Sequence, residues 1–152
     1  DLRRLAEELT AELVPRALHA GIDLGFDEGS EQPVWVSGNA LLLREALVNL
    51  VDNALRYAGR HAVVTVRVAG IEGQAQAVVE DNGPGVPQEE RERVLERFVR
   101  GTMDGNGCGL GLAIVREIVE RHAGSVRLEG AVPRGLRVIV RLPLAPAAPA
   151  KG

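Results

Sequence analysis

The spacing of apolar residues along the chain predicts where its helices lie. Apolar side chains recur every three or four positions in three long stretches, and a charged stretch adds one short helix. The predicted helices cover residues 2–20, 39–59, 88–98 and 110–124. Asn39 is a suitable N-cap, and Gly59 and Gly124 are suited to the ends of their helices. Pro15 should kink or interrupt the first helix, because it has no N–H to bond the carbonyl four residues earlier.

A second pattern, of alternating or β-branched residues, predicts strands. The predicted strands cover residues 22–26, 33–37, 62–70, 74–81, 125–130 and 136–144. The glycine-containing turn at 70–73 favours a hairpin between two of them. Helices interspersed with strands that are mostly joined as hairpins favour a two-layer α/β (α+β) sandwich over a doubly wound parallel sheet.

Length and composition then narrow the functional classes. A chain of 152 residues is the size of one domain, which we place at 1–144, and the low-complexity residues 145–152 should form a disordered tail. A net charge of −3 and 3% aromatic residues argue against nucleic acid, because few groups could neutralise phosphates or stack on bases. The single cysteine, Cys108, fits a reducing compartment.

The sequence shows neither a membrane-spanning run nor a signal peptide. No apolar run reaches the roughly 18 residues that cross a bilayer. The chain starts at Asp1 without a methionine or a signal peptide. We therefore expect it to be a piece of a longer protein.

The helix over 39–59 carries two asparagines, Asn49 and Asn53, within a nearly continuous apolar run. They stand four residues apart and so share one helix face. A buried amide without partners costs about 1–3 kcal/mol, which indicates that these amides have a ligand. Their oxygens could hold Mg²⁺ beside a triphosphate without adding negative charge.

Three charged residues, Glu45, Asp52 and Arg56, extend this face into a narrow polar ridge. The planar guanidinium of Arg56 could bind a phosphate through two N–H groups. The alternative is the solvated face of an ordinary amphipathic helix, which needs no ligand. The mixture of neutral amides with one guanidinium at the end favours a binding role.

The stretch 80-EDNGPG-85 follows a predicted strand. An aspartate fixed at a strand end, Asp81, could accept a hydrogen bond from the exocyclic amine of adenine and would reject the oxygen of guanine. Gly83 and Gly85 would let the backbone approach a base or sugar closely. The alternative is a simple β-turn, since these residues are also good turn formers.

The stretch 105-GNGCGLGL-112 opens directly into a predicted helix. Backbone N–H groups in such a turn and at a helix start form an anion site that suits phosphates. It is neither a Walker loop nor a G-x-G-x-x-G motif, because the required residues do not follow. A flexible linker is the alternative, but an apolar helix follows immediately.

The order of these motifs resembles that of a known family. The matching parts are Asn49 and the stretches 53-NALRYA-58, 81-DNGPG-85, 96-ERFVRG-101 and 107-GCGLGLAIVREIVERHAG-124. They resemble the ATP-binding domain of sensor histidine kinases, in the superfamily shared with DNA gyrase and MutL. The resemblance implies a mixed, mostly antiparallel sheet of about five strands with helices on one face, and ATP held between the helices and a mobile lid.

The resemblance also implies a role for each matching residue. The implied ATP-binding residues are Asn49, Asn53, Arg56, Tyr57, Asp81, Gly83, Gly85, Val86, Phe98, Gly107, Gly109, Leu110, Gly111 and Leu112. The implied catalytic residues are Glu45, Asn49, Arg97 and Arg100. Asn49 and Asn53 would hold Mg²⁺, and Asp81 would receive the adenine amine. Phe98 would anchor the lid, whose segment 101–106 is shorter than usual in the family.

The implied reaction is transfer of the γ-phosphoryl group of ATP to a histidine on a separate dimerisation domain, with ATP and Mg²⁺ as cofactors. Such transfer needs positioning and charge neutralisation more than covalent help from the protein. The histidines of this chain, His19, His61 and His122, lack the context of an acceptor, and we interpret them as structural or surface residues. The implied partners are that dimerisation domain and, through it, a response regulator. The implied setting is the cytoplasmic part of a homodimeric inner-membrane sensor.

Three alternatives stay open. An ATP-hydrolysing clamp of the gyrase or MutL type would use Glu45, one turn before Asn49, to activate water. A serine kinase acting on a protein partner shares the same fold. A module that only binds nucleotide would use the same pocket without any transfer.

Overall fold

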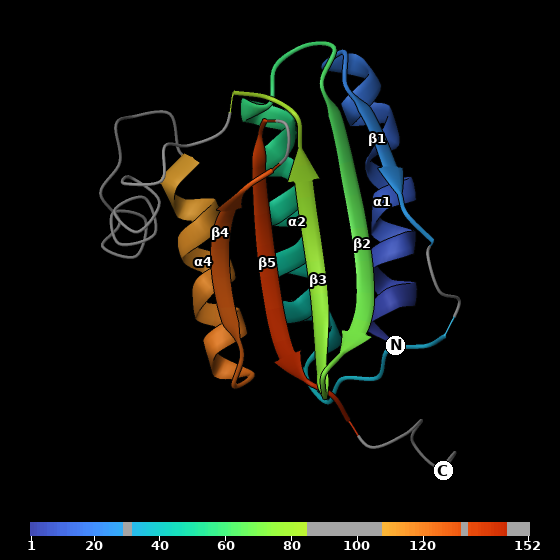
Figure 1. Ribbon diagram of the computed structural model, residues 1–152, viewed down its shortest axis with the longest axis vertical. Coiled ribbons are helices and arrows are strands. Elements are labelled where there is room, and N and C mark those ends of the chain that lie inside the picture. Colours follow the sequence, from blue (N-terminus) through green and yellow to red (C-terminus); the bar gives the residue numbers. More distant parts are fainter. Residues whose placement is uncertain (29–31, 85–107, 132–133, 146–152) are drawn as a thin grey trace.

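The computed structural model describes residues 1–28, 32–84, 108–131 and 134–145. These residues form helices interspersed with single strands and strand pairs (Figure 1). In chain order the elements are α1 (Leu2–His19), β1 (Asp23–Phe26), α2 (Ala40–Tyr57), β2 (Val63–Ile71), β3 (Gln74–Asp81), α4 (Cys108–Arg121), β4 (Ser125–Gly130) and β5 (Leu136–Pro143). None of the helices in these ranges is long and apolar enough to cross a membrane.

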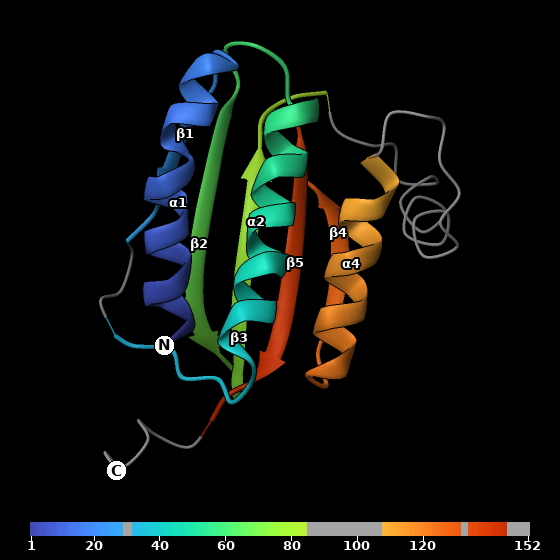
Figure 2. The ribbon, with the colours of Figure 1, turned by 180° about the vertical axis from the view of Figure 1, so that it is seen from behind.

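The described strands form one mixed sheet in the order β1-β2-β3-β5-β4. β1 pairs with β2 in parallel, and the other three pairings are antiparallel. Figure 1 views the open face of this sheet, and Figure 2 shows α1, α2 and α4 side by side on the other face. The two-layer fold with a mostly antiparallel sheet is therefore confirmed.

The strand register decides which side chains form the core between the two layers. Val64 pairs with Asp81 and Val66 with Val79, so these four side chains share one face of the sheet. The three valines are fully buried beneath the helices, together with Leu50 of α2. Because side chains alternate along a strand, this register places Asp81 on the helix-covered face at the end of β3.

The opposite face of the sheet is protected by its own charged side chains. Arg67, Glu80, Arg137 and Glu129 alternate in sign across β2, β3, β5 and β4, with ion-pair distances of 3.2, 3.0 and 3.7 Å. Each exposed pair adds at most about 1 kcal/mol. Val78 lies on this face and is nevertheless buried, since the arginine stems around it can cover apolar surface.

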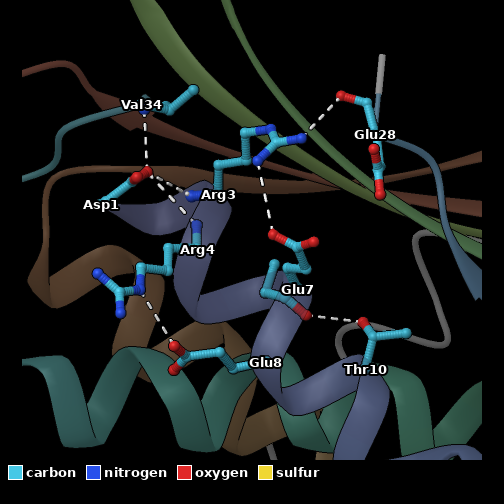
Figure 3. Close-up of polar contacts among 9 residues, drawn as sticks. Asp1, Arg3, Arg4, Glu7, Glu8, Thr10, Glu28 and Val34 are labelled. Atoms are coloured by element: carbon cyan, nitrogen blue, oxygen red, sulfur yellow. Dashed lines mark hydrogen bonds and ion pairs between the residues drawn. The ribbon is translucent and has the colours of Figure 1, made fainter. Parts of the chain in front are cut away.

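The start of α1 explains why the predicted strand at 33–37 does not form. Asp1 caps α1 by accepting hydrogen bonds from the N–H groups of Arg3 and Arg4, and it also accepts one from Val34 at 3.0 Å (Figure 3). The N–H of Leu2 donates to the carbonyl of Val34 at 2.7 Å. The N–H and carbonyl of Val34, which a strand would use for pairing, are therefore bound to the start of α1. The prediction of a strand here was wrong.

Pro15 does not interrupt the first helix, contrary to expectation, because α1 runs continuously to His19. The carbonyl that Pro15 leaves without an intrahelical partner belongs to Ala11, one turn earlier. Both residues are exposed, so water can bond that carbonyl. The missing hydrogen bond therefore costs little at this position.

His122 links the end of α4 to the start of α2. Its Nδ1 donates to the carbonyl of Ile118 at 2.8 Å, and its Nε2 accepts from the N–H of Asn39 at 3.1 Å. This pattern requires the neutral ring with the proton on Nδ1. Asn39 also caps α2 as predicted, by accepting from the N–H of Leu42. The structural interpretation of His122 is confirmed.

The end of α4 differs from the prediction in one residue. Ala123, not Gly124, adopts the left-handed conformation with φ 63°. The N–H of Gly124 then bonds the carbonyl of Val119 at 2.9 Å, as in a Schellman cap. Gly124 is required for space instead, because a Cβ there would lie 2.1 Å from the carbonyl oxygen of Arg141 in β5.

We expect Gly124→Ala to lower the free energy of unfolding by about 1–3 kcal/mol, because the new methyl group would force the end of α4 away from β5. Gly25→Ala is the matched control, since a Cβ at Gly25 would meet no atom within 4 Å. Urea denaturation of both variants checks this expectation. Equal unfolding midpoints for Gly124→Ala and the unmodified protein would contradict it.

Candidate functional site

The ends of three elements meet at one end of the molecule. The C-terminal ends of α2 and β3 and the first turn of α4 all lie at this end (Figure 2). Gly83, just after β3, comes very close to α2: a Cβ there would lie 2.4 Å from the carbonyl oxygen of Ala58 at the end of that helix. Only glycine permits this contact, so Gly83 allows the chain after β3 to lie against the end of α2.

The two asparagines of α2 lie on its partly buried face. The side-chain Nδ2 of Asn49 donates to the backbone carbonyl of Glu45 at 2.9 Å. Because a carbonyl can only accept, this bond leaves Oδ1 of Asn49 as the atom available to a ligand. The amide of Asn53 forms no side-chain hydrogen bond with the described residues. Both amides therefore offer oxygen ligands on one helix face.

Part of the polar ridge predicted along α2 contacts α1 and is not available to a ligand. Asp52 forms an ion pair with Arg16 of α1 at 2.8 Å, so its carboxylate serves the contact between two helices. Arg44, outside the predicted ridge, pairs with Glu12 of α1. Glu45 is exposed. The asparagines are thus separated from the charges that hold α1 to α2.

Two further predicted residues of α2, Arg56 and Tyr57, occupy its last turn. Both are exposed, with Tyr57 retaining 42% of its surface. They directly precede Ala58, which contacts Gly83. Their position beside the end of β3 is compatible with the predicted role in lining a nucleotide pocket.

Asp81 presents its carboxylate in a defined orientation. Its Oδ1 accepts hydrogen bonds from the N–H groups of Gly83 at 2.8 Å and Leu136 at 3.4 Å. Its Oδ2 forms no hydrogen bond with any described residue. One oxygen orients the group, and the other is left for a ligand.

The half-buried position of Asp81 changes its acidity. Burial raises the pKa of its carboxyl above the ordinary value of an aspartate, because the charged form is poorly solvated there. The hydrogen bonds from Gly83 and Leu136 act in the opposite direction, and the negative charge of Glu80 raises the pKa further. The net direction is upward.

The Gly-rich stretch enters α4 two residues earlier than expected, at Cys108. Gly109, Leu110 and Gly111 therefore belong to the first turn of the helix, whose N–H groups have no partner within the helix. Such a helix start favours anions. Leu112 is 3% exposed and packs in the core, so its side chain anchors the helix and is not available to a ligand.

The remaining predicted residues lie outside the described ranges, as does the predicted helix 88–98. The predicted site residues in this group are Gly85, Val86, Arg97, Phe98, Arg100 and Gly107. Their roles stay predictions.

Sequence reasoning missed the turn between β4 and β5. The guanidinium Nε of Arg134 donates to the carbonyls of Asn82 and Gly83, both at 3.2 Å. Gly135 has φ +116° and lies so close to Asp81 that a Cβ would meet its carbonyl oxygen at 1.9 Å. The only sequence signal was an Arg-Gly pair before a strand, which does not reveal a contact across about fifty residues.

The described groups fit a magnesium–nucleotide ligand better than a metal held by protein alone. The described ranges contain no cluster of three His, Cys, Asp or Glu side chains. Magnesium commonly takes one or two protein oxygens and completes its shell with phosphate and water. The amide oxygens of Asn49 and Asn53 suit that arrangement, because they add no charge beside a triphosphate.

Comparison with known proteins places the chain among a defined group. The model of the family described as histidine kinase-, DNA gyrase B- and HSP90-like ATPases matches residues 38–146. The sensor protein kinase PmrB of Pseudomonas aeruginosa is 42% identical over 146 residues, which are 94% of this chain and 30% of PmrB. The histidine-protein kinase/phosphatase MprB of Mycolicibacterium vanbaalenii is 42% identical over 74% of this chain and 24% of that protein. The chain thus spans a quarter to a third of these relatives.

Solved structures agree with this grouping. The mycobacterial sensor histidine kinase MprB superposes with a TM-score of 0.74 at 32% identity, over 93% of this chain and 94% of that one. Full-length ShkA in complex with AMPPNP superposes with a TM-score of 0.83 at 29% identity, over 98% of this chain and 31% of ShkA.

We expect the free energy of unfolding of Asp81→Asn, minus that of the unmodified protein, to increase as pH rises. A raised pKa means that the folded state holds the proton more tightly than the unfolded state, so this group stabilises the fold most at low pH and loses that contribution as pH rises through its folded pKa. Asparagine keeps the accepting oxygen but has no such titration. Denaturation between about pH 4 and about pH 7 should show this difference increasing.

Asp23→Asn, the same exchange at an exposed position of β1, is the control. If the free energy of unfolding of Asp81→Asn, minus that of the unmodified protein, decreased as pH rises, the raised pKa would be contradicted.

Proposed function

This chain belongs to the family of histidine kinase-, DNA gyrase B- and HSP90-like ATPases, and we propose that it is the ATP-binding catalytic domain of a two-component sensor histidine kinase. The observation that carries this proposal is the meeting of α2, the end of β3 and the start of α4 at one end of the fold. This arrangement puts the oriented carboxylate and the helix start beside the end of α2, whose C-terminal half carries the two amides.

Adenine would be recognised by Asp81. Its Oδ2 has no partner among the described residues and would accept a hydrogen bond from the exocyclic amine. Guanine presents an oxygen at that position, and two acceptors facing each other are unfavourable. Gly83 and Gly85 would let the base approach the backbone, and Val86, Arg56 and Tyr57 would line the pocket.

The phosphates would lie between α2 and the start of α4. Asn49 and Asn53 would hold Mg²⁺ through their amide oxygens, and the ion when bound would neutralise phosphate charge. The N–H groups of the first turn of α4, which holds Gly109, Leu110 and Gly111, would bind phosphate oxygens. Gly107 and Leu112 belong to the same stretch, Leu112 as its anchor in the core.

The reaction would transfer the γ-phosphoryl group to a histidine outside this chain. Arg97 or Arg100 would reach the γ-phosphate, and Phe98 would anchor the lid over the nucleotide. Phosphoryl transfer depends chiefly on alignment and charge neutralisation, which these residue types supply. The acceptor would lie on a helical dimerisation domain of the same protein, which passes the phosphoryl group to a response regulator.

The parent protein would be a homodimeric sensor with this domain on the cytoplasmic side of a membrane. Support comes from the names of the relatives, PmrB and MprB, which are sensor kinases several times longer than this chain. The family model covers residues 38–146, so we propose residues 1–144 as the catalytic domain. Ala145, the first residue of the predicted tail, donates its N–H to the carbonyl of Trp35 at 2.7 Å and so is held by the domain, while residues 146–152 lie outside the described ranges.

We expect Asp81→Asn to weaken ATP binding by about 1–3 kcal/mol, the usual cost of losing a hydrogen bond to a charged group. Titration calorimetry with AMPPNP and Mg²⁺ measures this directly. Asp52→Asn is the matched control, because that carboxylate pairs with Arg16 away from the site. An unchanged affinity in Asp81→Asn would remove Asp81 from nucleotide recognition.

We expect the domain to pass label from γ-labelled ATP to a matched histidine-containing dimerisation domain, giving an acid-labile phosphohistidine. The partner domain with its histidine replaced is the control. Glu45→Gln should change intrinsic ATP hydrolysis little, because Glu45 would be a structural or metal-shell residue in a kinase. A loss of about several hundredfold in hydrolysis in Glu45→Gln would favour a hydrolase. ATP binding without transfer would mean that the domain is not a histidine kinase and would favour a module that only binds nucleotide.

A further inference from the structure

The turn between β4 and β5 holds the loop that follows Asp81. Arg134 lies in this turn, and its Nε–H is shared between the carbonyls of Asn82 and Gly83, at 3.2 Å each. The side chain of Asn82 fixes the loop from the other side, since its Oδ1 accepts from the N–H of Val63 at 2.8 Å. The loop is therefore fastened both to β2 and to the turn before β5.

The backbone of the same turn touches Asp81 itself. Gly135 adopts φ +116°, and a Cβ there would lie 1.9 Å from the carbonyl oxygen of Asp81. The next residue, Leu136, donates its N–H to Oδ1 of Asp81 at 3.4 Å. The N–H of Ala131 bonds the carbonyl of Gly135 at 3.0 Å and closes the turn. Arg134 thus stands at the point where the turn and the loop meet.

A single rigid peptide unit connects Arg134 to the carboxylate. The carbonyl of Asn82 and the N–H of Gly83 belong to the same planar peptide group, so holding one end fixes the direction of the other. Arg134 holds the carbonyl end, and the N–H end donates to Oδ1 of Asp81 at 2.8 Å. A rotation of this peptide would break both hydrogen bonds at once.

We propose that Arg134 is a positioning residue for base recognition: it fixes the Asn82–Gly83 peptide so that Asp81 keeps Oδ1 bound and turns Oδ2 toward the purine amine. This inference rests on the proposed function, because it assumes that the site holds an adenine nucleotide. Arg134 forms no ion pair with any described residue, so the two loop carbonyls are the partners seen for its guanidinium. Hydrogen bonds from a charged donor to carbonyls are stronger than neutral ones.

The effect of Arg134 should be specific to the base. An adenine nucleotide uses Oδ2 of Asp81, whereas the oxygen of a guanine nucleotide would face that acceptor unfavourably. Loosening the loop should therefore weaken adenine binding and should not weaken guanine binding. A residue needed only for folding would weaken both nucleotides alike.

The test is calorimetry of AMPPNP and GMPPNP binding, with Mg²⁺ present, for the unmodified protein and for Arg134→Ala, Arg134→Gln and Arg134→Lys. We expect Arg134→Ala and Arg134→Gln to lower AMPPNP affinity about three- to tenfold, the effect of one lost hydrogen bond, without lowering GMPPNP affinity. Arg134→Lys keeps a charged donor and should restore part of the preference. Arg127→Ala is the matched control, because it removes the same charge from an ion pair with Glu129 on the open face of the sheet.

The outcomes separate this inference from the proposed function. An unmodified protein that binds neither nucleotide, or binds both equally, overturns the proposed function and this inference with it. An unmodified protein that prefers AMPPNP, with the same preference in Arg134→Gln, overturns the positioning role alone. Equal weakening of both nucleotides also overturns it. Should Arg134→Ala be unfolded by circular dichroism, Arg134→Gln decides the question.

Discussion

The close contact between Gly83 and Ala58 is the constraint on which the candidate site depends. A side chain at Gly83 would collide with the carbonyl of Ala58, so glycine alone lets the end of β3 lie against the end of α2. This contact sets the carboxylate of Asp81 beside the C-terminal end of α2, the helix whose C-terminal half carries Asn49 and Asn53. The core valines beneath α2 hold the two layers at that spacing.

Much of the fold was predictable because its signals are local. Alternating residues gave both strands of the β2–β3 hairpin, and the Asn39 side chain caps α2 as its position suggested. The prediction of a strand at 33–37 failed because a strand also needs a partner strand, and the backbone of Val34 is bound instead by Asp1 and Leu2 at the start of α1. The prediction that Pro15 would interrupt α1 failed because the carbonyl that it leaves unpaired belongs to an exposed residue, where water can bond it.

The site was predictable to the extent that its chemistry follows from residue type. Two amides one turn apart and an acid before two glycines already indicated Asn49, Asn53 and Asp81. The orientation of the Asp81 carboxylate was not predictable from the sequence. It depends on the N–H of Leu136 and on Arg134, which holds the Asn82–Gly83 peptide. These contacts join residues more than fifty positions apart, and no local pattern encodes them. The upward shift in the pKa of Asp81 likewise arises from burial in the assembled fold.

The central claim is that one aspartate reads the purine while a pair of amides holds the magnesium–triphosphate unit. A crystal structure of this domain with AMPPNP and Mg²⁺ tests it most directly. The account predicts the adenine amine within hydrogen-bond distance of Oδ2 of Asp81, and the ion bound through the amide oxygens of Asn49 and Asn53. A nucleotide bound elsewhere, or a pocket that stays empty at saturating nucleotide, would contradict it.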